Sequence, residues 1–183
     1  MSDVAKKSSS VSAVRPVLVL VAICMVAGAL LGAVHEVTAP IAEANAQAKA
    51  REIYAELVPD AKEFVEVECA VDGCTAALEA RDAAGGVIAY VIVAQSRGYG
   101  GQVPIAVAFA PKGTVKAITA MANDETPGLG TKIANESYIG QYVGLPAKTL
   151  TASDIDLISG ATISSKAALS AFDIAVEAYE EVH

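Results

Sequence analysis

The chain has 183 residues, of which 21 are acidic and 13 basic, and its formal net charge is −8. This length allows one domain with a sizeable hydrophobic core beside a short tail or anchor. An acidic surface repels the phosphates of nucleic acids and anionic lipid headgroups, so the charge argues against nucleic-acid binding.

The residue content also argues against several kinds of catalytic or metal site. The only histidines are His35 and His183, so no zinc ligand set converges. The sequence has no Cys-x-x-Cys-His motif for covalent haem. It has no Gly-x-Ser-x-Gly elbow either, and no histidine near the serines at 159–165 for a hydrolytic triad. Catalytic chemistry in this chain therefore requires a cofactor.

The first predicted element is a transmembrane helix at residues 16–35. No charged side chain occurs from Pro16 to Val34, and the 18 residues from Val17 onward would span about 27 Å as a helix, close to the hydrocarbon core of a bilayer. A cleaved signal peptide is the alternative. The apolar run is longer than a usual signal sequence core, and small-x-small triplets lie too far beyond it, so an uncleaved anchor is favoured.

Basic residues predict the orientation of this helix. Lys6, Lys7 and Arg15 precede it, whereas the first basic residue after it is Lys49. By the positive-inside rule, residues 1–15 form a cytoplasmic tail and the domain that follows the helix is extracytoplasmic, on the cell (inner) membrane. The residues after the helix include 20 acidic and 10 basic side chains, which gives this part a net charge of about −10.

The composition of residues 36–60 predicts a helical stalk. Residues 61–183 are predicted to form a compact domain. The stalk is rich in Ala, Glu, Gln and Lys with apolar residues near helical spacing, with a predicted break at Pro40 and an end near Pro59. In the domain, alternating and β-rich runs predict strands at 63–69, 75–80, 87–95, 103–110 and 114–121. Helices are predicted at 132–142 and 164–181. The inner face of the second helix comprises Ala168, Phe172, Ala175, Val176 and Tyr179. This order predicts an α+β fold, an antiparallel sheet with packed helices.

Two cysteines, Cys69 and Cys74, flank a predicted hairpin turn. Asp72-Gly73 between them is a hairpin signal. Whether the two thiols face each other across the hairpin depends on the strand register, which the sequence does not specify. An extracytoplasmic position favours oxidation. Two alternatives therefore stay open, a disulfide and two free thiols.

The most informative segment is 156–165, Asp-Leu-Ile-Ser-Gly-Ala-Thr-Ile-Ser-Ser. It places the Thr162 hydroxyl between a Ser-Gly-Ala turn and an Ala-rich helical run. The start of a helix offers free backbone N–H groups and the positive end of the macrodipole, which favour a phosphate, and Gly160 allows close backbone approach. The alternative is an ordinary Ser/Thr helix cap.

Two glycine-containing segments precede this one, Gly98-Tyr99-Gly100-Gly101 and Glu125-Thr126-Pro127-Gly128-Leu129-Gly130. Pro127 fixes one turn angle, and the glycines allow positive φ and close backbone approach to a flat ligand. Each segment alone is more typical of a plain turn.

Residues 156–162 resemble the flavinylation motif, Asp-x-x-Ser/Thr-Gly-Ala-Thr/Ser, of FMN-binding domains in bacterial membrane electron-transfer complexes. In that motif the last threonine carries FMN through a phosphoester bond, so the resemblance implies covalent FMN on Thr162. The glycine-containing segments resemble segments of the same order and spacing in G subunits of Rnf complexes and in the related C subunits of Na⁺-translocating NADH:quinone reductases. The resemblance covers roughly residues 10–183, and the compact length favours the G subunits.

The resemblance also implies roles for the other motif residues. Asp156 would serve recognition or activation by a flavin transferase, and Lys166 would partner the phosphodiester, with a solvated lysine as the alternative. Glu125 and Thr126 would bond to the isoalloxazine or ribityl edge. Ser159 and Ser165 would bond to phosphate oxygens or cap the turn, and Tyr99 would stack near the ring or pack on the sheet. The complete predicted cofactor site comprises Thr162, Ser159, Gly160, Ala161, Ser165, Lys166, Asp156, Glu125, Thr126, Gly128, Leu129, Gly130, Tyr99 and Gly100.

By resemblance, the protein is a membrane-anchored electron carrier in an ion-translocating ferredoxin:NAD⁺ oxidoreductase (Rnf) complex. It would relay electrons between neighbouring subunits and would not be catalytic alone. Its implied partners are the other Rnf subunits, the membrane and a flavin transferase. The alternatives are a stand-alone membrane-anchored flavoprotein, a C subunit of the NADH:quinone reductase, and a structural module with a vestigial motif.

Overall fold

The computed structural model describes residues 6–183, which divide into two units between Ala50 and Arg51. The first helix, α1 (Lys6–Leu57), is continuous across this division. The break predicted at Pro40 is therefore wrong. A proline removes one backbone hydrogen bond, and the bonds of the neighbouring turns keep the helix continuous here.

The apolar part of α1 has the length and composition of a membrane span. The window Pro16–Glu36 contains 21 residues with a mean hydropathy of 2.9, and none of it is buried in the protein. Leu18 and Leu31 are 62% and 72% exposed. A helix of 21 residues rises about 30 Å, which matches a bilayer core. The chain thus fits a single-pass membrane protein.

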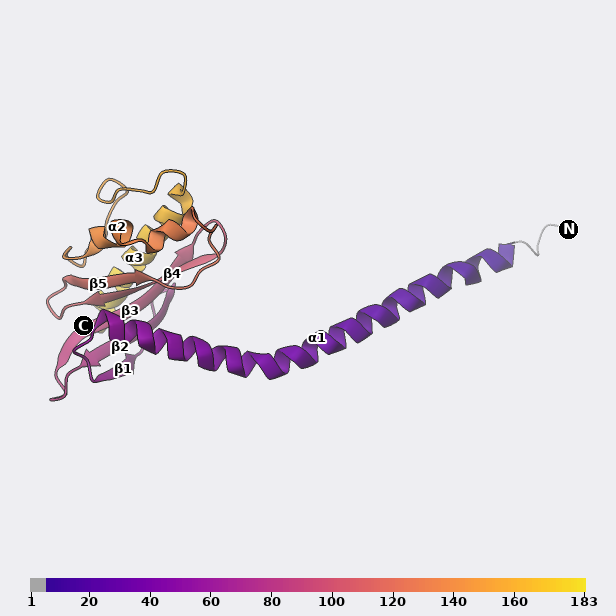
Figure 1. Ribbon diagram of the computed structural model, residues 1–183, viewed down its shortest axis with the longest axis horizontal. Coiled ribbons are helices and arrows are strands. Elements are labelled where there is room, and N and C mark those ends of the chain that lie inside the picture. The colour runs from indigo at the N-terminus through magenta and orange to yellow at the C-terminus, as the bar shows by residue number, and fades with distance from the viewer. Residues whose placement is uncertain (1–5) are drawn as a thin grey trace. The chain divides into compact units, whose positions relative to one another are not determined.

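The second unit, Arg51–His183, contains a five-stranded antiparallel sheet in the order β1-β2-β3-β4-β5 (Figure 1). Each strand pairs with its sequence neighbour, as expected for a meander of hairpins. The five predicted strands and the α+β class are confirmed. The strands are β1 (Glu63–Val67), β2 (Cys74–Arg81), β3 (Val87–Arg97), β4 (Gln102–Phe109) and β5 (Val115–Ala120).

Helix α3 (Thr162–Val182) covers one face of the sheet through contacts with β2, β3 and β4. Its predicted inner face is confirmed, since all five of those residues are buried. Phe172 lies at the centre, with its ring centroid 5.0 Å from that of Tyr142 and 6.2 Å from that of Phe109. Aromatic pairs at such distances add to the energy of area burial. This packing fixes where the N-terminus of α3 lies.

The prediction of a single helix at 132–142 is wrong in detail. The structure has three short helices there, η1 (Gly130–Ala134), α2 (Glu136–Ile139) and η2 (Gly140–Tyr142). Asn135 interrupts the helical run because its backbone is extended, with φ −71° and ψ 141°. The interruption turns Tyr138 and Tyr142 into the core beneath α3, where both are buried.

The last turn of α1 belongs to the core of the second unit. Tyr54, Leu57 and Val58 are buried, and the Tyr54 ring lies 6.0 Å from that of Phe64 on β1. The residues predicted as the end of a stalk therefore pack on the edge strand of the sheet.

Candidate functional site

The three motif segments meet at one pocket of about 540 Å³. The loop between β3 and β4 and the segment after β5 leave the same end of the sheet, because alternate strands of an antiparallel meander run in the same direction. The N-terminus of α3 reaches the same place. The pocket is lined by Tyr99, Glu125, Thr126, Leu129, Gly130, Gly160, Ala161, Thr162, Ile163 and Ser164.

Thr162 is the first residue of α3, and its side chain is exposed at the pocket. The N-cap is Ala161, and no side chain caps the helix. The turn before it closes through the Ala161 N–H, which donates to the Ile158 carbonyl (3.0 Å), and it requires Gly160 at φ +81°. The Thr162 hydroxyl therefore does not serve as the helix cap, which was the alternative interpretation of the Ser-Gly-Ala-Thr sequence.

Ser165 holds this turn from inside the protein. It is fully buried, and its hydroxyl donates to the Ala161 carbonyl (3.0 Å) and accepts from the Ile158 N–H (3.1 Å). Its own carbonyl accepts from the Tyr138 hydroxyl (2.8 Å). Ser165 thus supports the turn and is not among the pocket-lining residues.

Three further predicted residues, Asp156, Ser159 and Lys166, are exposed and lie outside the pocket lining. Asp156 is held through its backbone: its N–H donates to Oε1 of Gln141 (2.7 Å), and Nε2 of Gln141 donates to its carbonyl (3.3 Å). Its carboxylate is thus presented at the surface on a fixed segment, six residues before Thr162.

Glu125 is the buried charge of the site, with 3% of its surface exposed. Its carboxylate accepts from the Ser164 hydroxyl on α3 and from the Gly100 N–H (3.0 Å). Burial by itself would raise the pKa of this carboxyl, but the hydrogen bonds from Ser164, Gly100, Tyr99 and Gly101 outweigh it and hold the pKa below its usual value. These contacts occupy the carboxylate oxygens of Glu125, which the sequence analysis expected to bond to the edge of the flavin.

Glycines surround the Glu125 carboxylate because side chains would not fit there. A Cβ at Gly98 would overlap Oε1 of Glu125, and one at Gly130 would lie 2.7 Å from Oε2 of Glu125 and 2.8 Å from the Ser164 hydroxyl oxygen. A Cβ at Gly100 would overlap the Asp124 carbonyl oxygen. The glycines of both segments therefore allow close packing around a buried anion.

The segment 126–131 forms a tight turn over the pocket. Gly128 has φ +74°, and its N–H donates to the Thr131 hydroxyl (2.9 Å), while the Leu129 N–H donates to the Thr126 carbonyl (3.1 Å). Leu129 packs toward Gly160, where an added Cβ would lie 3.3 Å from its Cδ1. Gly100 and Gly128 shape the pocket without being part of its lining.

The pocket rim is apolar and accessible. Tyr99 is 73% exposed and Ile163 is 57% exposed, and Leu129 is also partly exposed. Among the residues that the structure describes, no group of three or more His, Cys, Asp or Glu side chains is placed to hold a metal ion. The arrangement suits an organic ligand with one flat apolar part and one anionic part at the helix N-terminus.

Sequence reasoning missed Ile163, Ser164 and Gln141. Ile163 and Ser164 directly follow Thr162, and the first turn of a helix next to a pocket is a signal that would have included them. Gln141 carries no such signal, because its contact with Asp156 depends on the packing of η2 against a segment 15 residues away.

Comparisons with known proteins show the family of the chain. The family of FMN-binding domains matches residues 98–177. The chain is 33% identical over 161 residues to the G subunit of the proton-translocating ferredoxin:NAD(+) oxidoreductase complex of Clostridium ljungdahlii, with 84% of each chain covered. It belongs to the family of G subunits of these ion-translocating oxidoreductase complexes.

Two further proteins are similar to the chain. The G subunit of the ion-translocating oxidoreductase complex of Methanosarcina acetivorans is 31% identical over 180 residues, with 93% of this chain and 96% of the relative covered. Among solved structures, NqrC of Shewanella oneidensis aligns with 67% of this chain and 70% of its own, at a TM-score of 0.49 and 17% identity. The sequence relatives support the interpretation as a G subunit over a C subunit or a stand-alone flavoprotein.

Gly100→Ala should lower the free energy of unfolding of the protein by about 1–3 kcal/mol, because the new Cβ would overlap the Asp124 carbonyl oxygen. Gly101→Ala is the matched control, since its Cβ would lie 3.7 Å from the nearest atoms of Asp124 and should change stability by less than about 0.5 kcal/mol. Urea unfolding of both variants measures the difference. Equal stabilities would contradict the close packing described here.

Glu125→Gln should lower the free energy of unfolding at pH 7 by about 1–3 kcal/mol, because hydrogen bonds to a charged acceptor are weakened in a buried site. Since the pKa of Glu125 is lowered by folding, its charged form stabilises the protein above the unfolded-state pKa of about 4.3. That stabilisation is lost as the pH falls through the lower folded-state pKa. The difference between wild type and variant should therefore shrink below about pH 4.

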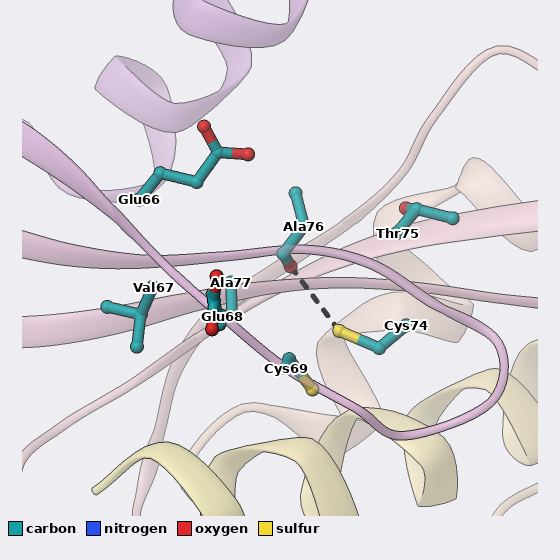
Figure 2. Close-up of a pocket in the computed structure, with 8 residues that line it drawn as sticks. All are labelled: Glu66, Val67, Glu68, Cys69, Cys74, Thr75, Ala76 and Ala77. Atoms are coloured by element: carbon teal, nitrogen blue, oxygen red, sulfur yellow. Dashed lines mark hydrogen bonds between the residues drawn. The ribbon is translucent and has the colours of Figure 1, made fainter.

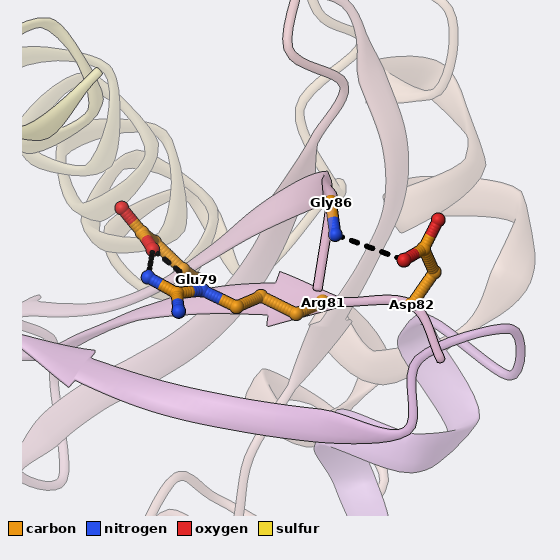
Figure 3. Close-up of polar contacts among 4 residues, drawn as sticks. All are labelled: Glu79, Arg81, Asp82 and Gly86. Carbon is orange, nitrogen blue, oxygen red and sulfur yellow. Dashed lines mark hydrogen bonds and ion pairs between the residues drawn. The ribbon is translucent and has the colours of Figure 1, made fainter. Parts of the chain in front are cut away.

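Glu79→Gln is the control for this experiment. The Glu79 carboxylate pairs with Nη2 of Arg81 at 2.6 Å on a partly exposed face of β2 (Figure 3). Such a surface pair contributes about 0–1 kcal/mol. A Glu125→Gln effect no larger than that of Glu79→Gln, or one independent of pH, would show that the Glu125 carboxylate is not the ionised group that joins these segments.

Proposed function

We propose that this protein is an electron-carrier subunit of a membrane-bound ion-translocating ferredoxin:NAD⁺ oxidoreductase and that it holds FMN covalently through a phosphoester to Thr162. The single observation that carries the proposal is the exposed Thr162 hydroxyl, which is free of any capping role and opens onto a pocket at the start of α3. The family match and the names of the relatives, which are subunits of such complexes, support it.

The residues present fit FMN. A volume of about 540 Å³ lies in the usual range for cofactor pockets. The apolar side chains of Tyr99, Leu129 and Ile163 offer surfaces for a flat ring. The first N–H groups of α3, which lack partners within the helix, favour the negative phosphodiester, and Lys166 is the fifth residue of the same helix. When bound, FMN supplies one- and two-electron redox chemistry.

The residues of the chain position and retain the cofactor. Ser165 and Gly160 hold the turn that presents the Thr162 hydroxyl. Gln141 fixes the backbone of Asp156, whose exposed carboxylate is the group we assign to recognition by a flavin transferase. Glu125 joins the Tyr99 loop to α3 and thereby holds two walls of the pocket together. A covalent bond prevents loss of the flavin outside the cell membrane.

We place residues 1–15 in the cytoplasm, the helix at 16–35 in the membrane and residues 61–183 outside, with 36–60 as the connecting stalk. The basic residues before the span and the acidic balance after it support this orientation. The other membrane subunits of the complex would then be the electron donors and acceptors of the flavin.

Thr162→Ala should abolish covalent flavin. After coexpression with a flavin transferase, the wild-type band should fluoresce under ultraviolet light in a denaturing gel, whereas the Thr162→Ala band should be dark. Thr151→Ala is the control, because it removes an exposed hydroxyl from the same surface segment without touching the pocket. A dark wild-type band in the presence of an active transferase would overturn the covalent assignment.

The proposed orientation predicts which positions react in intact cells. In a chain whose native cysteines are replaced, Ala84→Cys lies on the exposed turn between β2 and β3 and should react with a membrane-impermeant maleimide. Ser8→Cys, before the span, should react only after the cells are opened. The reverse labelling pattern would place the domain in the cytoplasm.

A further inference from the structure

The turn between β1 and β2 brings two cysteines together at a second pocket. The β1–β2 ladder ends at the pair Val67–Ala77, so Cys69 and Cys74 lie beyond it and are not cross-strand partners. The turn is instead closed by the Cys74 N–H, which donates to the Val71 carbonyl (3.1 Å). Gly73 has φ +88°, which a glycine adopts without strain.

Both thiols line a pocket of about 440 Å³. Figure 2 shows the two sulfur atoms on the same side of the turn, with that of Cys74 directed at the Ala76 carbonyl (3.7 Å). The Cys69 thiol donates to Oε2 of Glu181 (3.5 Å). Both cysteines are partly buried and pack against the core. The turn thus places both thiols in the lining of the same pocket.

We propose that Cys69 and Cys74 form a reversible intramolecular disulfide that closes the open end of the β1–β2 hairpin. In the reaction, the two thiols lose two protons and two electrons and one S–S bond forms. The oxidant is a second disulfide, which reacts by thiol–disulfide exchange and is reduced to two thiols. This chemistry uses neither the flavin nor its attachment site.

The surroundings of the pair do not stabilise the reduced form as a thiolate. Burial and the neighbouring Cys69 thiol raise the pKa of Cys74 to about 12, and the negative charge of Glu181 acts in the same direction. Catalytic disulfides are strongly oxidising because their surroundings stabilise the reduced thiolate. Here the thiolate is disfavoured, and Glu66 and Glu68 also line the pocket. The disulfide should therefore exchange slowly and resist reduction.

The position of the pair gives the disulfide a mechanical role. β1 is an edge strand that pairs only with β2, and its other end follows the last turn of α1. At the turn, the Ala70 N–H donates to both carboxylate oxygens of Glu181 near the end of α3 (3.2 and 3.3 Å). A covalent bond between residues 69 and 74 would hold the turn beyond the last β1–β2 pair, Val67–Ala77.

Thiol counting tests the proposal on purified full-length Cys24→Ala protein, in which Cys69 and Cys74 are the remaining cysteines. The protein is equilibrated with an excess of oxidised over reduced glutathione, denatured, and treated with a maleimide polymer that shifts the gel band once per thiol. We expect no addition, a mass lower by two hydrogen atoms, and two additions after strong reductant. Two free thiols, or two glutathione adducts, would overturn the proposal.

Thermal unfolding tests the mechanical role. Strong reductant should lower the midpoint for the oxidised Cys24→Ala protein by several degrees, because the cross-link no longer restricts the unfolded chain. A variant that also carries Cys69→Ser and Cys74→Ser should show no response to reductant. Equal midpoints for the oxidised and reduced Cys24→Ala protein would overturn the stabilising role of the bond. Because no step depends on bound FMN, failure here and failure of the proposed function are distinguishable.

Discussion

Segments that are 25 and 39 residues from Glu125 in sequence converge on its buried carboxylate, and the candidate site depends on this convergence. A buried carboxylate is costly unless hydrogen-bond donors surround it. Here the donors are the Ser164 hydroxyl and backbone N–H groups of the loop that contains Tyr99 and Gly100. The charge thus fixes the distance between two walls of the pocket, and the glycines at 98, 100 and 130 leave the space that it needs.

The second constraint is the packing of α3 on the sheet. Phe172 and Tyr179 bury one face of the helix against β3 and β4, so the helix cannot shift along its axis without opening the core. Its first turn is held independently by Ser165 and by the Tyr138 hydroxyl. The Thr162 hydroxyl is consequently presented from a rigid element, whereas the exposed segment before it is open to a modifying enzyme. Rigid presentation of one reactive group on an accessible surface suits a site of enzymatic attachment.

The acidic side chains of the domain occupy two kinds of position. Most carboxylates after the membrane span are exposed, and pairs such as Glu79 with Arg81 lie at the surface, where ion pairs contribute little. Glu125 and Glu181 differ because each joins separate parts of the chain, the first at the candidate pocket and the second at the turn that contains the cysteines. The same residue type therefore provides solubility in one place and tertiary connections in another.

The sequence by itself determined the apolar helix, the five strands, the long C-terminal helix and the identity of Thr162 as the site candidate. These follow from local patterns, namely an uncharged apolar run, period-two alternation, helical spacing and a short motif. Only the tertiary structure decided that α1 continues through Pro40, that Asn135 splits the predicted helix, and that Gln141 fixes Asp156. It also decided that Ser164, rather than Ser165, faces the pocket and binds Glu125. The contacts of Gln141 and Ser164 join residues far apart in the chain, so no local pattern encodes them, and they exist only after the domain has packed.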